Sequence, residues 1–274
     1  MNTQLDWFKI LTDCKNNVED TIKPHLKTLN EPQPDLGEGA GGDAMKPIDL
    51  AAEKAIVNTL QDHGISFSLI SEESGFEKYG NTPEECYVTI DPIDGTTNLL
   101  RGLPFYASSI AISRKPFIAE VYAALVTDLY HDITYMAQKN KGAYRDGERI
   151  KPSQISNLQE AVIGMDLNSY KVAEIAPKLT DLIQQTRHIR HYGANALELC
   201  YVANGLTDAF VDIRGKLRTT DAAAGFLIVK EAGGLITDIN NQSVNVKLDP
   251  RQSLNFVASG NAKIHNTILG LVKS

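Results

Sequence analysis

Apolar side chains recur at helical spacing at the start of the chain and then give way to strand-like runs. One apolar stripe over residues 4–29 predicts a long amphipathic helix, and a second stripe predicts a helix from Pro47 to Gly64. Short β-branched runs follow at "SFSLIS" and "CYVTI", and alternation between Ser108 and Tyr144 predicts an antiparallel meander. The first half therefore has an α+β pattern.

Strands and helices alternate along the second half. Strands are predicted at "AVIGMD", "HIRHYG", "DAFVDI", "LITDI" and "NFVAS", with helices over about residues 171–186, at "NALELCYVANG" and at "DAAAGFLIVKEAGG". This is an α/β pattern. Because 274 residues with 42% hydrophobic content can form two modest cores, we expect an α+β domain over residues 1–155 and an α/β domain over residues 156–274.

The net charge and the cysteines indicate which binding partners and which cellular location to expect. The formal net charge of -7 argues against nucleic acid as the main partner, because phosphate-backbone binding usually needs a basic face. Cys14, Cys86 and Cys200 lie far apart without a C-x-x-C pair, so we expect reduced core cysteines and a cytoplasmic protein. No run has the character of a signal peptide or a membrane span, so no membrane contact is expected.

Carboxylates gather where predicted strands end. Glu72 and Glu73 follow "SFSLIS", Asp91 and Asp94 follow "CYVTI", and Asp221 begins a predicted helix with alanines in its first turn. Repelling acids at one corner require a cation, and ligands that are all oxygen favour Mg²⁺ or Mn²⁺ over zinc. The next residues, "GTT", offer backbone N–H groups and hydroxyls to an anion. Together these features favour a metal-phosphate site over unrelated turns and helix caps.

Several longer stretches resemble one family of enzymes. "ISEES", "IDPIDGTTN", "GANALELCYVANGLTDAFVDIRG" and "TTDAAAGFLIVKEAGG" closely resemble the inositol monophosphatase family of metal-dependent phosphatases. The glycine-rich loop and "DIRGKLR" look most like its archaeal-type branch, whose members often hydrolyse both inositol 1-phosphate and fructose 1,6-bisphosphate. The resemblance covers roughly residues 5–260 and implies a layered αβαβα sandwich of the sugar phosphatase type, in a homodimer.

The resemblance also implies which residues hold the metal ions. A first Mg²⁺ would be bound by Glu72, Asp91 and the carbonyl of Ile93, and a second by Asp91, Asp94 and Asp221. Glu73 would help to hold a weaker third ion and is counted among the catalytic residues. Two or three Mg²⁺ ions are therefore expected, with Mn²⁺ as a substitute.

The same resemblance assigns the catalytic and phosphate-binding residues. Gly95 and Thr96 would bind phosphate through backbone amides, and Thr96 together with Asp49 would orient and activate the attacking water. Two metal ions can activate a water and neutralise the leaving alkoxide, so no protein nucleophile is required. The expected substrate is a small phosphorylated polyol or sugar.

The sequence offers fewer candidate residues for binding the rest of the substrate. Asp212, in "FVDIRG", matches the position of a family carboxylate that binds substrate hydroxyls. Arg214, Lys216 and Arg218 are candidates for binding a second phosphate, although solvated surface positions are the simpler interpretation. The loop "NEPQPDLGEGAGGDAMKP" is expected to be mobile and to close over the metal site, with Asp43 or Lys46 near it.

Three alternatives remain open from the sequence. One is an adenosine 3',5'-bisphosphate phosphatase of the same family. Another is an aspartyl-phosphate phosphotransferase, suggested by "DGT", although such enzymes need two acids separated by one residue, whereas Asp91 and Asp94 are separated by two. The third is a non-catalytic module that binds a metal or a phosphorylated ligand.

Overall fold

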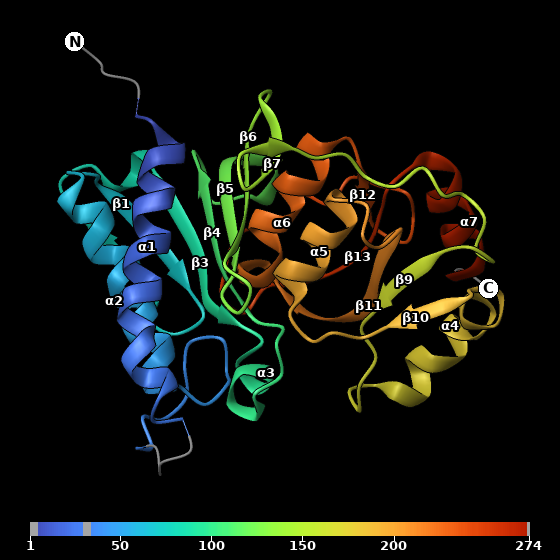
Figure 1. Cartoon of the computed structure of the whole chain (residues 1–274), viewed down its shortest axis with the longest axis horizontal. Coiled ribbons are helices and arrows are strands. Elements are labelled where there is room, and N and C mark those ends of the chain that lie inside the picture. Colours follow the sequence, from blue (N-terminus) through green and yellow to red (C-terminus); the bar gives the residue numbers. More distant parts are fainter. Residues whose placement is uncertain (1–4, 30–33, 273–274) are drawn as a thin grey trace.

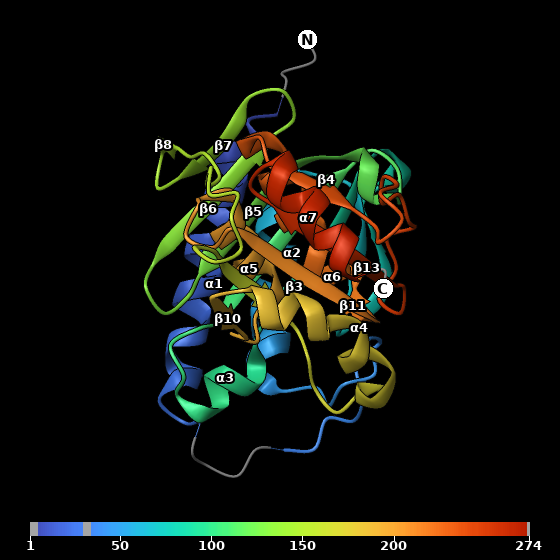
Figure 2. The same ribbon diagram turned by 90° about the vertical axis from the view of Figure 1, so that its right-hand side faces the viewer.

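The computed structural model describes residues 5–29 and 34–272, and its elements stack in five layers (Figure 1). Two helices cover the outer face of the first sheet, two lie between the sheets, and two cover the far face of the second sheet, where α4 and α7 lie side by side (Figure 2). The predicted αβαβα sandwich is thus confirmed. The three pairs, in that order, are α1 (Trp7–Leu26) with α2 (Pro47–Asp62), α5 (Asn195–Ala203) with α6 (Thr219–Ala232), and α4 (Val172–Gln185) with α7 (Ala262–Val272).

The first sheet has the strand order β2-β1-β3-β4-β5-β6-β7-β8. Only β1 and β3 pair in parallel among these strands, and the other neighbours are antiparallel, which confirms the predicted meander. The strands are β1 (Phe67–Ser71), β2 (Gly75–Tyr79), β3 (Tyr87–Asp94), β4 (Ala107–Ser113), β5 (Val121–Asp128), β6 (Ile133–Gln138), β7 (Gly142–Arg145) and β8 (Glu148–Arg149). A short helix, α3 (Thr96–Arg101), follows β3.

The second sheet has the order β10-β9-β11-β13-β12 and mixes both pairing directions. The central strand β11 pairs in parallel with β9 and antiparallel with β13, and it continues five residues beyond the predicted "DAFVDI". Its strands are β9 (Val162–Met165), β10 (His188–Arg190), β11 (Ala209–Arg218), β12 (Leu235–Thr237) and β13 (Ser253–Ser259). Strand β2 and helix α7 were not predicted from the sequence.

The two sheets share one apolar layer. Helices α5 and α6 contact strands of both sheets, and the largest buried cluster runs from the first sheet through these helices to the second. Within it, Phe256 makes edge contacts with Phe210 and Phe226, with ring centroids 5.4 and 5.1 Å apart. Because the two halves bury apolar surface against the same helices, side chains from both halves are held in fixed relation at the interface.

Other features of the fold concern the cysteines and membrane contact. Cys14, Cys86 and Cys200 are all buried with free thiols, in agreement with the prediction. None of the helices in the described part of the chain combines the length and apolar character that crossing a bilayer requires.

Candidate active site

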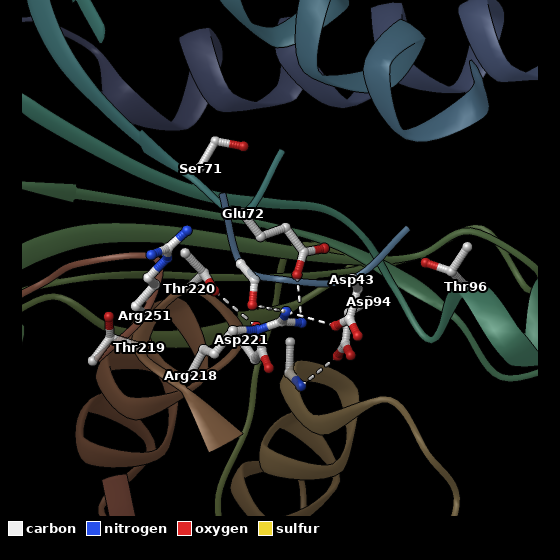
Figure 3. Close-up of polar contacts among 12 residues, drawn as sticks. Asp43, Ser71, Glu72, Asp94, Thr96, Arg218, Thr219, Thr220, Asp221 and Arg251 are labelled. Carbon is white, nitrogen blue, oxygen red and sulfur yellow. Dashed lines mark hydrogen bonds and ion pairs between the residues drawn. The ribbon is translucent and has the colours of Figure 1, made fainter. Parts of the chain in front are cut away.

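Two parallel strands bring acidic residues to one edge of the first sheet. Ser71, the last residue of β1, pairs with Ile90 of β3, so Glu72 and Asp91 are neighbours at the same sheet edge. Parallel pairing explains this juxtaposition, because the carboxyl ends of both strands then point the same way. Figure 3 shows the Glu72 side chain directed towards the guanidinium of Arg218, near Asp221.

A bulge at the end of β3 turns two carboxylates into the site. The register between β3 and β4 shifts between Asp91 and Asp94, and Gly95 then adopts a left-handed conformation with φ of 87°. A Cβ at Gly95 would lie 3.0 Å from Ala194 Cβ and 3.1 Å from the carbonyl oxygen of Phe105. Only glycine fits this close approach without displacing its neighbours.

Asp221 comes to the same edge from the second half of the chain. It is the third residue of α6, whose N-cap is Arg218, so Asp221 is not an N-cap itself. Glu72, Asp91 and Asp221 each offer one carboxylate oxygen, and these oxygens all lie within 4.8 Å of one another. The three predicted ligands are therefore brought together by two strands and one helix.

Burial and mutual repulsion raise the pKa values of these acids. Burial raises the pKa of Asp91 well above its usual range, and the carboxylates of Glu72 and Asp94 raise it further. Burial and then the charge of Glu73 raise the pKa of Asp49 to about 8, and burial and then Glu72 raise the pKa of Glu73 to about 7. Such a cluster is stable in its ionised form only beside a cation.

The donor set fits a hard divalent cation. Asp91 Oδ1, Asp49 Oδ1 and Glu73 Oε2 are buried, and none has a hydrogen-bond partner among the residues that the structure describes. Buried carboxylate oxygens without partners are costly unless an ion takes them up. Ligands that are all carboxylate or carbonyl oxygen suit Mg²⁺, Mn²⁺ or Ca²⁺ rather than a soft metal.

A cavity of about 390 Å³ opens onto the acidic edge. Most residues that the sequence analysis selected line it, namely Asp49, Glu72, Glu73, Asp91, Ile93, Asp94, Gly95, Thr96 and Asp221. The Thr96 hydroxyl donates a hydrogen bond of 2.9 Å to the carbonyl oxygen of Ile93. This bond fixes the hydroxyl beside the carbonyl that was expected to bind the first ion.

The glycine-rich loop is docked at the rim of this cavity. The amides of Ala40 and Gly41 donate to the carbonyls of Glu73 and Glu72 over 3.0 and 2.7 Å. Asp43 and Lys46 line the cavity, as expected for the part of the loop that the structure describes, while residues 30–33 lie outside the described residues.

One important residue of the site was not recognised as such in the sequence. Arg218 was interpreted as a solvated surface side chain, but its guanidinium forms ion pairs with Asp43, Glu72 and Asp221. The sequence signal was its position three residues before Asp221, since that spacing places both side chains on one side of the first turn of a helix.

A second cavity, of about 620 Å³, adjoins the first and shares Asp43, Arg218 and Asp221 with it. Arg214 lines this second cavity and is itself buried, so the surface interpretation of Arg214 is wrong. Its guanidinium donates to both oxygens of Asp212, over 3.0 and 2.6 Å, and to Asp166.

The position of Asp212 requires a correction. Its side chain has no exposed surface, and Arg214 covers both of its carboxylate oxygens, so the expected direct contact with substrate hydroxyls is absent from this arrangement. Asp166, which the sequence analysis missed, lines the second cavity instead. Its Oδ1 atom accepts no hydrogen bond from the described residues, and the nearest ring nitrogen of His191 lies 3.4 Å away.

Comparisons with known proteins point to one family of enzymes. The family model described as the inositol monophosphatase family matches residues 7–274. A protein from Thermococcus kodakarensis named fructose-1,6-bisphosphatase/inositol-1-monophosphatase is 33% identical over 272 residues, which cover 98% of each chain. A solved structure described as an inositol monophosphatase-fructose 1,6-bisphosphatase superposes with a TM-score of 0.85 at 30% identity, covering 97% of this chain and all of that one.

Another relative has a name that gives two activities. A protein from Methanococcus maripaludis named bifunctional NADP phosphatase/NAD kinase is 35% identical over 286 residues. The match covers 97% of this chain but 49% of the relative, so this chain spans about half of that protein.

Proposed function

This chain belongs to the inositol monophosphatase family, and on that premise we propose that it is a Mg²⁺-dependent phosphatase of small phosphorylated sugars or polyols. The proposed substrates are inositol 1-phosphate and fructose 1,6-bisphosphate. The observation that carries the proposal is the cluster of buried carboxylates that follows β1 and lies in β3 and α6, facing one cavity.

The proposed metal ligands follow from the donor set at that edge. Glu72, Asp91 and the Ile93 carbonyl would hold one ion, Asp91, Asp94 and Asp221 would hold a second, and Glu73 would help to hold a third. When bound, such ions supply Lewis acidity that activates water and neutralises the charge developing on the phosphate and the leaving oxygen. The side chains Asp49 and Thr96 then have to place the attacking water.

Asp49 and Thr96 are suited to that task by their hydrogen bonds. The Thr96 hydroxyl donates its hydrogen bond to the carbonyl oxygen of Ile93. Its oxygen can therefore accept a hydrogen bond from a water in the cavity. Asp49, in the first turn of α2, has an oxygen with no partner among the described residues and can accept the other proton. Two acceptors fix the orientation of one water, which leaves its lone pair free for in-line attack.

The second cavity supports a substrate with a second anionic group. Among its cations, Arg214 and Arg218 are paired with acids, whereas Lys216 and Arg251 form no ion pair with any described residue. Both are available to a second phosphate, as fructose 1,6-bisphosphate would present. Asp166 lines this cavity, and its Oδ1 atom, which accepts no hydrogen bond from the described residues, would accept one from a sugar hydroxyl.

A second candidate is a nucleotide phosphatase that removes a ribose phosphate. It is favoured by the relative named NADP phosphatase/NAD kinase and by the ring of Tyr170, which lines the second cavity with Lys216 Nζ 5.8 Å from its centroid. An aromatic face beside cations suits a base attached to a phosphorylated ribose. Adenosine 3',5'-bisphosphate and NADP belong to this class.

The experiment that separates these substrates is a ranking of kcat/KM. Phosphate release is measured from inositol 1-phosphate, fructose 1,6-bisphosphate, adenosine 3',5'-bisphosphate and NADP under the same Mg²⁺ concentration. The proposal expects the sugar and polyol phosphates to rank first, with Lys216→Gln raising KM for the bisphosphate but not for inositol 1-phosphate. A nucleotide ranking first would favour the second candidate, and no release from any of the four would contradict both.

The dimer is what the family resemblance implies, the location rests on the three free cysteines, and the lack of a nucleic-acid partner rests on the net charge of -7. We propose a homodimer in the cytoplasm that acts on a small molecule without a nucleic-acid or membrane partner. Light scattering on the purified protein tests the dimer, because a monomeric mass at micromolar concentration would exclude it.

A further inference from the structure

Arg218 occupies a position between the acidic cluster and the glycine-rich loop (Figure 3). Its Nη2 atom lies 2.5 Å from Glu72 Oε2, and its Nε atom lies 3.5 Å from Asp221 Oδ1. Its Nη1 atom lies 2.7 Å from Asp43 Oδ2, on the loop. One planar group therefore contacts two proposed metal ligands and the loop at once.

The charge of this side chain is permanent. Burial opposes the charged form, but the carboxylates of Asp221 and Glu72 more than offset this and raise the pKa of Arg218. An arginine in this setting does not lose its proton at any working pH. Its positive charge must therefore be taken into account in every state of the site.

The loop is shaped around this guanidinium. A Cβ added at Gly41 would lie 2.7 Å from Arg218 Nη1 and 3.1 Å from Glu72 Cβ, so a side chain there would displace the arginine. A second arginine, Arg251, also holds the loop, donating from Nε to the carbonyl oxygen of Ala40 over 3.0 Å. Unlike Arg218, it forms no ion pair with a carboxylate of the described site.

We propose that Arg218 is a positioning residue that acts as an internal cation, competing with the metal ion for Glu72 and Asp221 and linking metal binding to the docking of the loop. The proposal rests on the proposed metal site. A divalent ion bound to Glu72 Oε2 would lie close to the guanidinium that contacts the same oxygen at 2.5 Å, and the repulsion between the two cations would weaken both contacts. When Glu72 and Asp221 turn to an ion, the same guanidinium must change its contacts with Asp43 and Gly41.

Competition and structural support predict opposite changes in metal affinity when Arg218 is removed. If Arg218 only supported the fold of the site, its removal would weaken metal binding. If it competes, its removal takes a positive charge from beside the ligands, and metal binding becomes tighter. The repulsion between two unit charges about 4 Å apart in a protein site amounts to several RT. We therefore expect the metal affinity to rise by about tenfold or more.

The test compares Mn²⁺ binding to chelator-treated Arg218→Gln and wild type, followed by electron paramagnetic resonance without substrate. Arg251→Gln is the matched control, because it loosens the same loop without removing a charge that contacts the ligands. We expect about tenfold tighter binding in Arg218→Gln, little change in Arg251→Gln, and faster hydrogen exchange of the Ala40 and Gly41 amides in both. Unchanged or weaker binding in a folded Arg218→Gln would overturn the proposal.

A measurement on the wild type covers the case in which Arg218→Gln does not fold. The arginine Nε–H signals are followed by nitrogen-edited NMR while Mg²⁺ is added, with Arg214, held by Asp166 and Asp212, as an internal reference. The Arg218 signal should shift along the binding curve while that of Arg214 changes little, and an Arg218 signal that does not move would overturn the proposal. If the wild type binds neither ion, the proposed metal-dependent function fails first, and this inference fails with it.

Discussion

The carboxylate of Asp94 accepts a hydrogen bond of 2.6 Å from the backbone N–H of Ala196, 102 residues later in the chain. This bond ties the end of β3, in the first half, to the start of α5, in the second. The acidic site is therefore held where the two halves meet.

The first prediction concerns the charge of Asp94. Asp94→Asn keeps an oxygen that can accept the Ala196 hydrogen bond but removes a charged ligand of the second ion, so kcat should fall by orders of magnitude while the fold is retained. Steady-state kinetics together with thermal unfolding check both parts. Near-wild-type turnover would remove Asp94 from the metal site.

The second prediction separates positioning of water from metal binding. Thr96→Ala should lower kcat far more than it lowers metal affinity, because the hydroxyl is proposed to orient water rather than to bind the ion. Thr96→Ser, which keeps the hydroxyl, is the control and should recover most of the turnover. Equal losses of turnover and metal affinity in Thr96→Ala would instead assign the hydroxyl a structural role through Ile93.

The third prediction tests the corrected role of Asp212. Asp212→Asn removes one charged partner of the buried Arg214, which should reduce the free energy of unfolding by about 3 kcal/mol, as measured in urea. The free energy should change because the carboxylate is buried behind the arginine. An unchanged stability with a raised KM would restore the direct contact between Asp212 and the substrate.

The fourth prediction concerns pH and Glu198, a buried acid in α5. Burial raises the pKa of Glu198 to about 8, even though the amides of Tyr192 and Gly193 donate to one of its oxygens. The native state therefore binds a proton that the unfolded state, with an ordinary pKa of about 4.3, has already lost. This contribution to stability is complete below about pH 4 and disappears as the pH rises through about 8.

Glu198→Gln should flatten that part of the pH dependence. Between pH 5 and 8, the free energy of unfolding of Glu198→Gln should change less with pH than that of the wild type. The two slopes should differ by up to about 1.4 kcal/mol per pH unit when unfolding is measured in the presence of chelator. Chelator keeps the titration of the metal site from being altered by bound ions. The same slope in wild type and Glu198→Gln would show that Glu198 is not the protonated group.

The acidic edge could be predicted because its causes are local. Strand-like runs ending in Glu72 and Asp91 were readable, and parallel pairing of β1 with β3 then places those ends together. The edge strand β2 was missed because most of its side chains are exposed, so "GFEKY" shows no buried pattern. Helix α7 begins at Ala262, beyond the region that carries the motifs, so no motif indicates it.

Apart from the spacing between Arg218 and Asp221, no local pattern reveals the contacts of Arg218 or the burial of Asp212. Arg218 meets Glu72 and Asp43 across more than 140 residues, and neither spacing leaves a trace in the sequence. Asp212 precedes an irregular part of β11, where the register against β13 shifts before Leu217. Arg214 follows Asp212 by two residues and so lies on the same face of the strand, but this alternation does not reveal that the guanidinium covers both carboxylate oxygens of Asp212.

The central claim is that the carboxylates of this site hydrolyse phosphate monoesters through bound divalent ions. The most direct test measures phosphate release from fructose 1,6-bisphosphate with Mg²⁺, after chelation, and after Mg²⁺ is restored. We predict release that disappears on chelation and returns with the metal. Release that persists at the same rate in excess chelator would contradict the account.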